Sequence, residues 1–122
     1  AAYFVLTHSQ GLAASGDVQP IAMLNIFLAG LMFGAAQLRT RALALTIALH
    51  FALNFTQGPL LGFGVSGNAE SGLLQPNLDD APTWWTGGSF GLEASVPGTV
   101  LILLALILLL RRAANAPPAT RA

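Results

Sequence analysis

The stretch IAMLNIFLAGLMFGAAQL, residues 21–38, decides the fold class, because it contains no charged side chain in 18 residues. At a rise of about 1.5 Å per residue, a helix of this length nearly crosses a hydrocarbon core of about 30 Å. A segment in lipid must satisfy its own backbone hydrogen bonds, which an α-helix does internally. Residues 21–38 are therefore predicted to form a transmembrane helix.

Two more long apolar stretches follow this one. Residues 42–63 come directly after Arg39-Thr40-Arg41, which predicts a membrane hairpin, and residues 96–110 end at Arg111-Arg112. The last stretch reaches full spanning length only if its helix begins near Leu92. Residues 1–10 have the apolar character of the end of another helix. The predicted fold is an all-α, polytopic membrane helical bundle with about three spanning helices plus the end of a truncated one.

The composition supports this class and excludes others. Hydrophobic residues make up 54% of the 122 residues and charged residues 8%, whereas soluble domains carry about a quarter charged residues. Five arginines, no lysine and a net charge of zero leave no basic patch for a nucleic acid. The absence of cysteine removes disulfides and cysteine-based zinc sites.

The domain organisation follows from the same patterns. Residues 1–112 are predicted to form the bundle, with a long outer loop at 64–95, and residues 113–122 a disordered tail. The chain starts without methionine inside an apolar run, so we expect it to be the C-terminal piece of a longer protein.

If each stretch crosses once, all arginines fall on one side of the membrane, which predicts a cytoplasmic C-terminus. Trp84 and Trp85 are expected to anchor the loop at the lipid headgroups. The expected location is a bacterial cytoplasmic membrane, with the lipid bilayer as partner.

Polar residues inside the apolar stretches are the candidates for function, since they are costly in lipid. His50 lies mid-span, with Thr46 four residues before it, Asn54 four residues after it and Gln57 one turn further on. This spacing places them along one helix face. Thr46 and Gln57 are interpreted as interhelical hydrogen-bonding groups, and His50 with Asn54 as functional.

The preceding stretch contributes small and polar residues. Gly30 and Gly34 form a small-xxx-small pair, which predicts close helix packing. Asn25 precedes Gly30 by five residues and therefore lies on a different face. The direction in which Asn25 points is left open by the sequence.

The two histidines and Asn54 are the candidate site residues, and they limit which kinds of catalytic or binding site the sequence can form. No HExxH motif is present, and every acidic residue lies in a loop or at the end of a stretch. The histidines could ligate a haem or a metal, or act as base and oxyanion donors around a water activated by a carboxylate supplied from elsewhere. The sequence by itself thus predicts at most half of a hydrolytic site.

Two motifs carry a family resemblance. Phe4-x-x-x-His8 and His50-x-x-x-Asn54, each on an apolar helix, resemble the second and third motifs of the CPBP family of intramembrane proteases. That family includes the CAAX prenyl endopeptidases and bacterial Abi proteins. The resemblance implies that His8 is a general base or ligand and that His50 and Asn54 polarise the scissile carbonyl. In a metal-dependent variant of the mechanism, His8 and His50 would bind a divalent metal such as zinc.

The family's first motif, Glu-Glu-x-x-x-Arg, is missing from this sequence. Glu70 and Glu93 lie in the long loop and are not expected to replace it, so this chain alone is predicted to be inactive. The resemblance implies an intramembrane endopeptidase that uses an activated water on a peptide or membrane-protein substrate, and no nucleic acid. The alternatives are a non-catalytic bacteriocin-immunity or scaffold protein and a bis-histidine haem or metal membrane protein.

Overall fold

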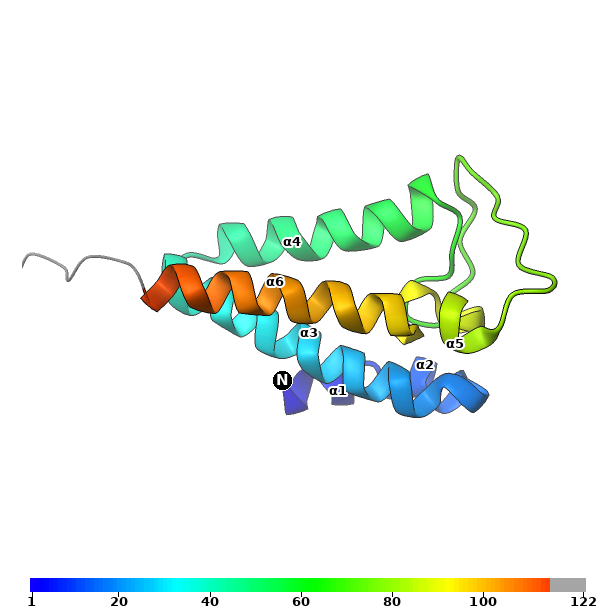
Figure 1. The fold of residues 1–122 in the computed structure, drawn as a ribbon, viewed down its shortest axis with the longest axis horizontal. Helices are drawn as coiled ribbons and strands as arrows, with labels where there is room; N and C mark the ends of the chain where they lie inside the picture. Colours follow the sequence, from blue (N-terminus) through cyan, green and yellow to red (C-terminus); the bar gives the residue numbers. More distant parts are fainter. Residues whose placement is uncertain (115–122) are drawn as a thin grey trace, which may run out of the picture.

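The computed structural model describes residues 1–114, which are helical throughout apart from turns and one long loop. The long helices are α3 (Gln19–Thr40), α4 (Leu43–Phe55) and α6 (Val96–Ala114). The short ones are α1 (Ala2–Thr7), α2 (Ser9–Ala14) and α5 (Thr83–Thr86). The helix α3 packs against both α6 and α4, and α1 and α2 lie along α3 on the side away from α6 (Figure 1). The all-α prediction is confirmed for the described residues.

Only α3, together with the turn before it, has the length and apolar composition predicted for a transmembrane helix. The segment Gly16–Thr40, which is α3 and the 3-10 turn η1 (Gly16–Val18) before it, is the one helix in residues 1–114 long and apolar enough to cross a membrane. Arg41 then adopts a left-handed conformation, with φ of 51°, and ends α3. The chain reverses there into α4, as the predicted hairpin requires. The number of spanning helices, and with it the polytopic arrangement, stays a prediction.

The other two apolar stretches depart from their predicted bounds. The predicted helix 42–63 ends early: α4 passes at Thr56 into a π-helical turn, η2 (Thr56–Leu60), which contains Pro59, and no helix follows at residues 61–63. Proline has no backbone N–H to continue a helix. The last helix does not begin near Leu92, because Ser95 is extended, with φ of −118° and ψ of 157°. Its apolar part is therefore Val96–Arg111, shorter than the span prediction assumed.

Gly30 and Gly34 have different surroundings. A Cβ at Gly30 would lie 2.7 Å from the Cα of Ala1, so this glycine allows α1 to pack on α3. A Cβ at Gly34 would meet nothing within 4 Å. The prediction of close packing is confirmed at Gly30 and is wrong at Gly34.

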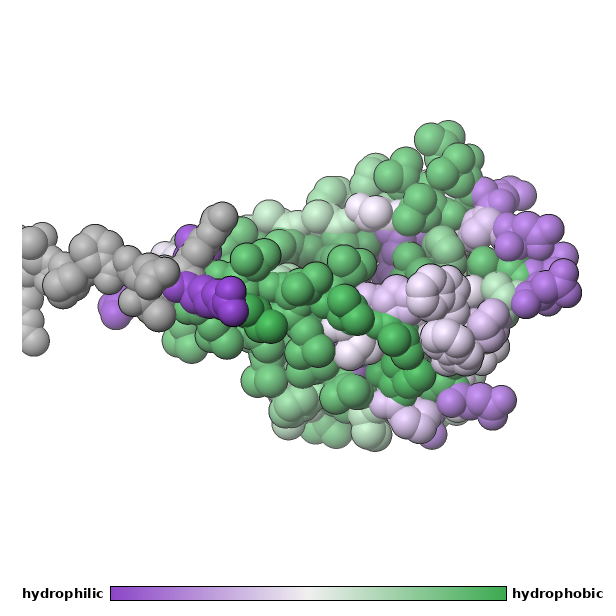
Figure 2. All heavy atoms as spheres, in the orientation of Figure 1, coloured by the Kyte–Doolittle hydropathy of each residue, from purple (hydrophilic) through white to green (hydrophobic). Residues whose placement is uncertain are grey.

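The surface is divided along the long axis of the molecule. Figure 2 shows an apolar band over the helices, with hydrophilic residues gathered at the two ends. Exposed leucine, isoleucine and phenylalanine side chains on α4 and α6 contribute to this band. The loop at 64–95 contains α5 and the 3-10 turns η3 (Gly88–Phe90) and η4 (Leu92–Ala94). Residues 115–122, most of the predicted tail, lie outside the described residues.

Candidate functional site

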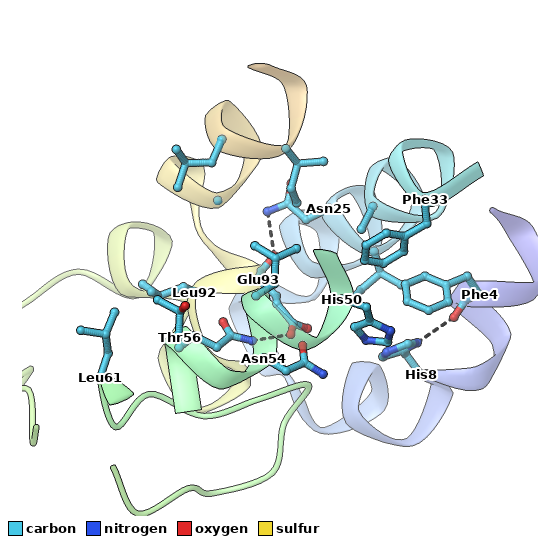
Figure 3. A pocket seen from close by; sticks show the side chains of 17 residues that line it. Phe4, His8, Asn25, Phe33, His50, Asn54, Thr56, Leu61, Leu92 and Glu93 are labelled. Atoms are coloured by element: carbon cyan, nitrogen blue, oxygen red, sulfur yellow. Dashed lines mark hydrogen bonds between the residues drawn. The ribbon is translucent and has the colours of Figure 1, made fainter. Parts of the chain in front are cut away.

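A cavity of about 240 Å³ lies between α1, α3, α4, η4 and α6. Both sequence motifs line it, through Phe4, His8, His50 and Asn54 (Figure 3). Most of the remaining wall is apolar and comes from α3, α4 and α6, including Phe33, Leu53, Leu101 and Ile102. The three predicted site residues, which are up to 46 positions apart in the sequence, thus share one apolar cavity.

His8 sits where α1 ends and α2 begins. Its backbone leaves the helical region, with φ of −103° and ψ of 10°, and its Nδ1 lies 2.7 Å from the carbonyl oxygen of Phe4. A carbonyl only accepts hydrogen bonds, so Nδ1 donates and Nε2 keeps its lone pair. The Phe4 ring also contacts the imidazole, with ring centroids 4.5 Å apart. The four-residue spacing of this motif thus fixes both the orientation and the tautomer of His8.

His50 and Asn54 lie one turn apart on α4, as their spacing predicts. The His50 ring is half-buried between two aromatic rings, with centroids 5.0 Å from Phe33 and 5.7 Å from Phe4. Figure 3 shows the rings of His8 and His50 close to each other at one end of the cavity. Thr46, one turn before His50, donates a 3.2 Å hydrogen bond to the carbonyl oxygen of Phe33. This bond joins α4 to α3, so the interhelical interpretation of Thr46 is confirmed.

Glu93 lines the same cavity, which the sequence analysis did not anticipate. This loop acid reaches the cavity because η4 folds back against α3 and α6. The Glu93 carboxylate accepts hydrogen bonds from the Gln57 amide and, at 2.8 Å, from Ser66 Oγ. Burial raises the pKa of Glu93 above its ordinary value, while Ser66, Gln57 and the charge of His8 act in the opposite direction.

Asn25 explains why η4 adopts this position. The side chain of Asn25 is fully buried, and its Nδ2 donates to the carbonyl oxygens of Glu93, at 2.7 Å, and of Ser95, at 2.9 Å. Its Oδ1 accepts from Thr99 Oγ1 at 2.7 Å. Asn25 therefore ties the backbone at Glu93 to α3 and α6. Buried amides need partners, so Asn25 and Gln57 were the sequence signals that could have pointed to Glu93.

The donor groups do not form a metal centre. In the part of the chain that the structure describes, no group of three or more histidine, cysteine, aspartate or glutamate side chains is arranged to hold a metal ion. A structural or catalytic zinc site needs at least three protein ligands. A cavity of about 240 Å³ also falls below the range of about 300–1,000 Å³ typical of cofactor sites. The described residues alone therefore do not supply the three protein ligands of a zinc site.

Comparison with known proteins identifies the segment that holds both motifs. Residues 1–56 match the family described as Type II CAAX prenyl endopeptidase Rce1-like. No curated protein and no solved structure gives a significant match to the chain. The matched segment runs from α1 into the end of α4 and includes His8, His50 and Asn54. The resemblance to the CPBP family of intramembrane proteases is thus confirmed for residues 1–56, which match an Rce1-like family model.

Proposed function

We propose that the chain carries the histidine and asparagine groups of an intramembrane endopeptidase, which hydrolyses a peptide bond with an activated water. One observation carries this proposal: His8, at the junction of α1 and α2, and His50 and Asn54, on α4, line a single apolar cavity. The match of residues 1–56 to a family of prenyl endopeptidases supports it. An apolar cavity with a few converging polar groups is the usual form of a small-molecule or active site.

The proposed roles follow from the hydrogen bonds. His8 has its Nδ1 engaged by the Phe4 carbonyl, which leaves Nε2 to accept a proton from water as a general base. His50 and Asn54 are proposed to donate hydrogen bonds to the carbonyl oxygen of the scissile bond. Such donors stabilise the charge that develops on that oxygen and contribute about 10²–10³ in rate each.

The proposed setting is the lipid bilayer. The apolar band in Figure 2 and the length of α3 support a membrane-embedded protein. Arg39, Arg41 and Arg111 lie exposed at helix ends, which supports a cytoplasmic side there and a cytoplasmic C-terminus. A bacterial cytoplasmic membrane remains the proposed location.

The proposed substrate is a peptide or membrane protein with an apolar group near the cleaved bond. The description of the matched family names CAAX prenyl endopeptidases. In a prenylated CAAX sequence, the apolar group near the cleaved bond is an isoprenoid. Phe33, Leu53 and Ile102 give the cavity an apolar wall next to the histidines. A farnesylated CAAX peptide is therefore a suitable probe.

The test uses an internally quenched farnesylated CAAX peptide and, in proteoliposomes, the intact protein, in which we expect the first motif to accompany this chain. Cleavage by the wild type and a loss of at least about 10²-fold in His50→Gln and Asn54→Ala are expected. Gln10→Ala, an exposed polar residue on α2 outside the cavity, is the control and should cleave like the wild type. Absence of cleavage by the wild type, or equal rates in His50→Gln, would contradict the proposal.

A further inference from the structure

A second space adjoins the apolar cavity along α4. It is an open groove of about 490 Å³, and His50 and Asn54 line both the cavity and the groove. The other residues of the groove come from α4, from η2 and from the loop that follows: Ile47, Phe51, Phe55, Pro59, Val65 and Glu70. A peptide whose cleaved bond lies at His50 and Asn54 can therefore occupy both spaces, one on each side of the bond.

Resting on the function proposed above, we infer that this groove binds the peptide segment that follows the cleaved bond, and that Glu70 selects a basic residue in that segment. The apolar group that precedes the bond fits the cavity, whose wall is apolar, which leaves the groove for the segment after the bond. The volume of the groove lies within the range of about 300–1,000 Å³ that is typical of ligand sites.

The loop that carries Glu70 is fastened to the end of the helix. The backbone N–H of Leu73 donates a 2.8 Å hydrogen bond to the carbonyl oxygen of Pro59. Gly58 allows the loop to approach closely, since a Cβ there would lie 2.8 Å from Val65 Cγ2 and 3.1 Å from Glu70 Cγ. The side chain of Glu70 therefore packs directly over Gly58, at one end of the groove.

This position is within reach of the second residue after the cleaved bond. Gly58 lies four residues after Asn54, which corresponds to about 6 Å along a helix that rises about 1.5 Å per residue. An extended peptide advances about 3.3 Å per residue, so about two residues cover the same distance. The first residue after the bond thus lies along the apolar wall, and the second lies near the Glu70 carboxylate.

The charge of Glu70 gives the groove its selectivity. Glu70 is exposed, and it is the one acidic residue that lines the groove in the described part of the chain. Arg39 and Arg41 precede the other end of α4, and Gly58 follows Arg41 by 17 residues, or about 25 Å of helix. This distance exceeds the Debye length of about 8 Å at physiological ionic strength. These two arginines therefore leave Glu70 able to attract a basic side chain and to repel an acidic one.

Other occupants of the groove make a different prediction. Phe51 and Phe55 are exposed and stack with ring centroids 5.6 Å apart, so a lipid chain, a second copy of the chain or another helix of the intact protein could cover this apolar surface. With any of these in place, the substrate does not reach Glu70. Cleavage would then be independent of charge in the peptide, whereas a peptide in the groove makes it depend on that charge.

The experiment measures kcat/KM of the intact protein in proteoliposomes with internally quenched farnesylated peptides. The peptides are amidated at the C-terminus and differ only in the second residue after the cleaved bond, which is lysine, glutamine or glutamate. The wild type should cleave the lysine peptide about 3- to 30-fold faster than the glutamate peptide, as expected when one exposed ion pair is exchanged for a like-charge pair. This preference should shrink in about 1 M salt, where the Debye length is about 3 Å.

Substitutions then test whether Glu70 is the selecting group. Glu70→Gln should abolish the preference, and Glu70→Lys should reverse it. Asp80→Lys makes the same change of charge at an exposed loop position outside both spaces, and this matched control should keep the wild-type preference. Moving the lysine of the peptide from the second to the fifth residue after the bond should also abolish the preference.

Each outcome decides one of the two proposals. If the wild type cleaves all three peptides at equal rates, or if Glu70→Gln keeps the preference, the inference is overturned and the proposed function stands. If Asp80→Lys removes the preference as fully as Glu70→Gln does, the selection comes from the overall charge of the loop, and the inference is again overturned. If the wild type cleaves none of the peptides, the proposed function fails and this inference fails with it. Should Glu70→Lys not fold, the nearly isosteric Glu70→Gln decides the outcome.

Discussion

Replacing Asn25 by alanine should destabilise the fold by about 2–4 kcal/mol. The substitution removes three hydrogen bonds at a fully buried site, to the carbonyl oxygens of Glu93 and Ser95 and from the hydroxyl of Thr99. Interhelical hydrogen bonds in membrane proteins contribute about 0.6 kcal/mol on average and up to about 1.7 kcal/mol. Three of them give about 2–4 kcal/mol once the cost of leaving buried groups without partners is included.

Thr46→Val is the reference variant with which the loss of free energy of unfolding in Asn25→Ala is compared. It removes a single interhelical hydrogen bond, from α4 to the carbonyl oxygen of Phe33, and should cost about 0.6–1 kcal/mol. The assay is reversible unfolding in mixed micelles, followed by far-UV circular dichroism. Tryptophan fluorescence provides a local signal, because α5, which carries both tryptophans, packs against η4. If Asn25→Ala is no more destabilising than Thr46→Val, Asn25 does not hold η4 in place.

Four further expectations can be checked with the same preparations. Gly30→Ala should lower the free energy of unfolding by about 1–3 kcal/mol, because the new Cβ would meet the backbone of Ala1. Gly34→Ala should be neutral or should raise it by up to about 1 kcal/mol through helix propensity. Since burial raises the pKa of Glu93 in the folded state, the folded protein keeps a proton that the unfolded chain has lost. Stability should therefore fall as the pH rises from the ordinary glutamate range through the raised pKa, and Glu93→Gln should flatten this slope in unfolding measured against pH. Trp84 and Trp85, both exposed, should be quenched most by lipids brominated near the headgroups; strongest quenching by lipids brominated at the chain ends would contradict interfacial anchoring. Chelators should leave peptide cleavage unchanged, because the cavity lacks a metal-binding set of donors; loss of activity that is restored by added zinc would show that this assignment is wrong.

The helices and the histidine motifs were predictable because short-range spacing determines them. An uncharged run fixes α3, and four-residue spacing places Phe4 beside His8 and His50 beside Asn54. Such relationships depend on helix geometry alone. The family resemblance alone led us to expect both motifs in one cavity. Spacing within a helix cannot predict this, because the two motifs lie on different helices.

The position of Glu93 was not predictable from local patterns. Its side chain reaches the cavity because Asn25 holds the turn at η4 from about 70 residues away in the sequence, at 2.7 Å from the Glu93 carbonyl oxygen. The π-helical turn that ends this helix contains Pro59, and the hydropathy of residues 42–63 alone does not reveal it. The conformation of Ser95, which delays the start of α6, depends on the same long-range bonds to Asn25.

The most direct test of the central claim is the cleavage of a farnesylated CAAX peptide by the intact protein, with its first motif present, and by its His50→Gln variant, at equal amounts of folded protein in proteoliposomes. The account predicts cleavage by the wild type and a rate at least about 10²-fold lower in the variant. Equal rates for the two proteins, or no cleavage by the wild type, would contradict the assignment of this cavity as a protease site.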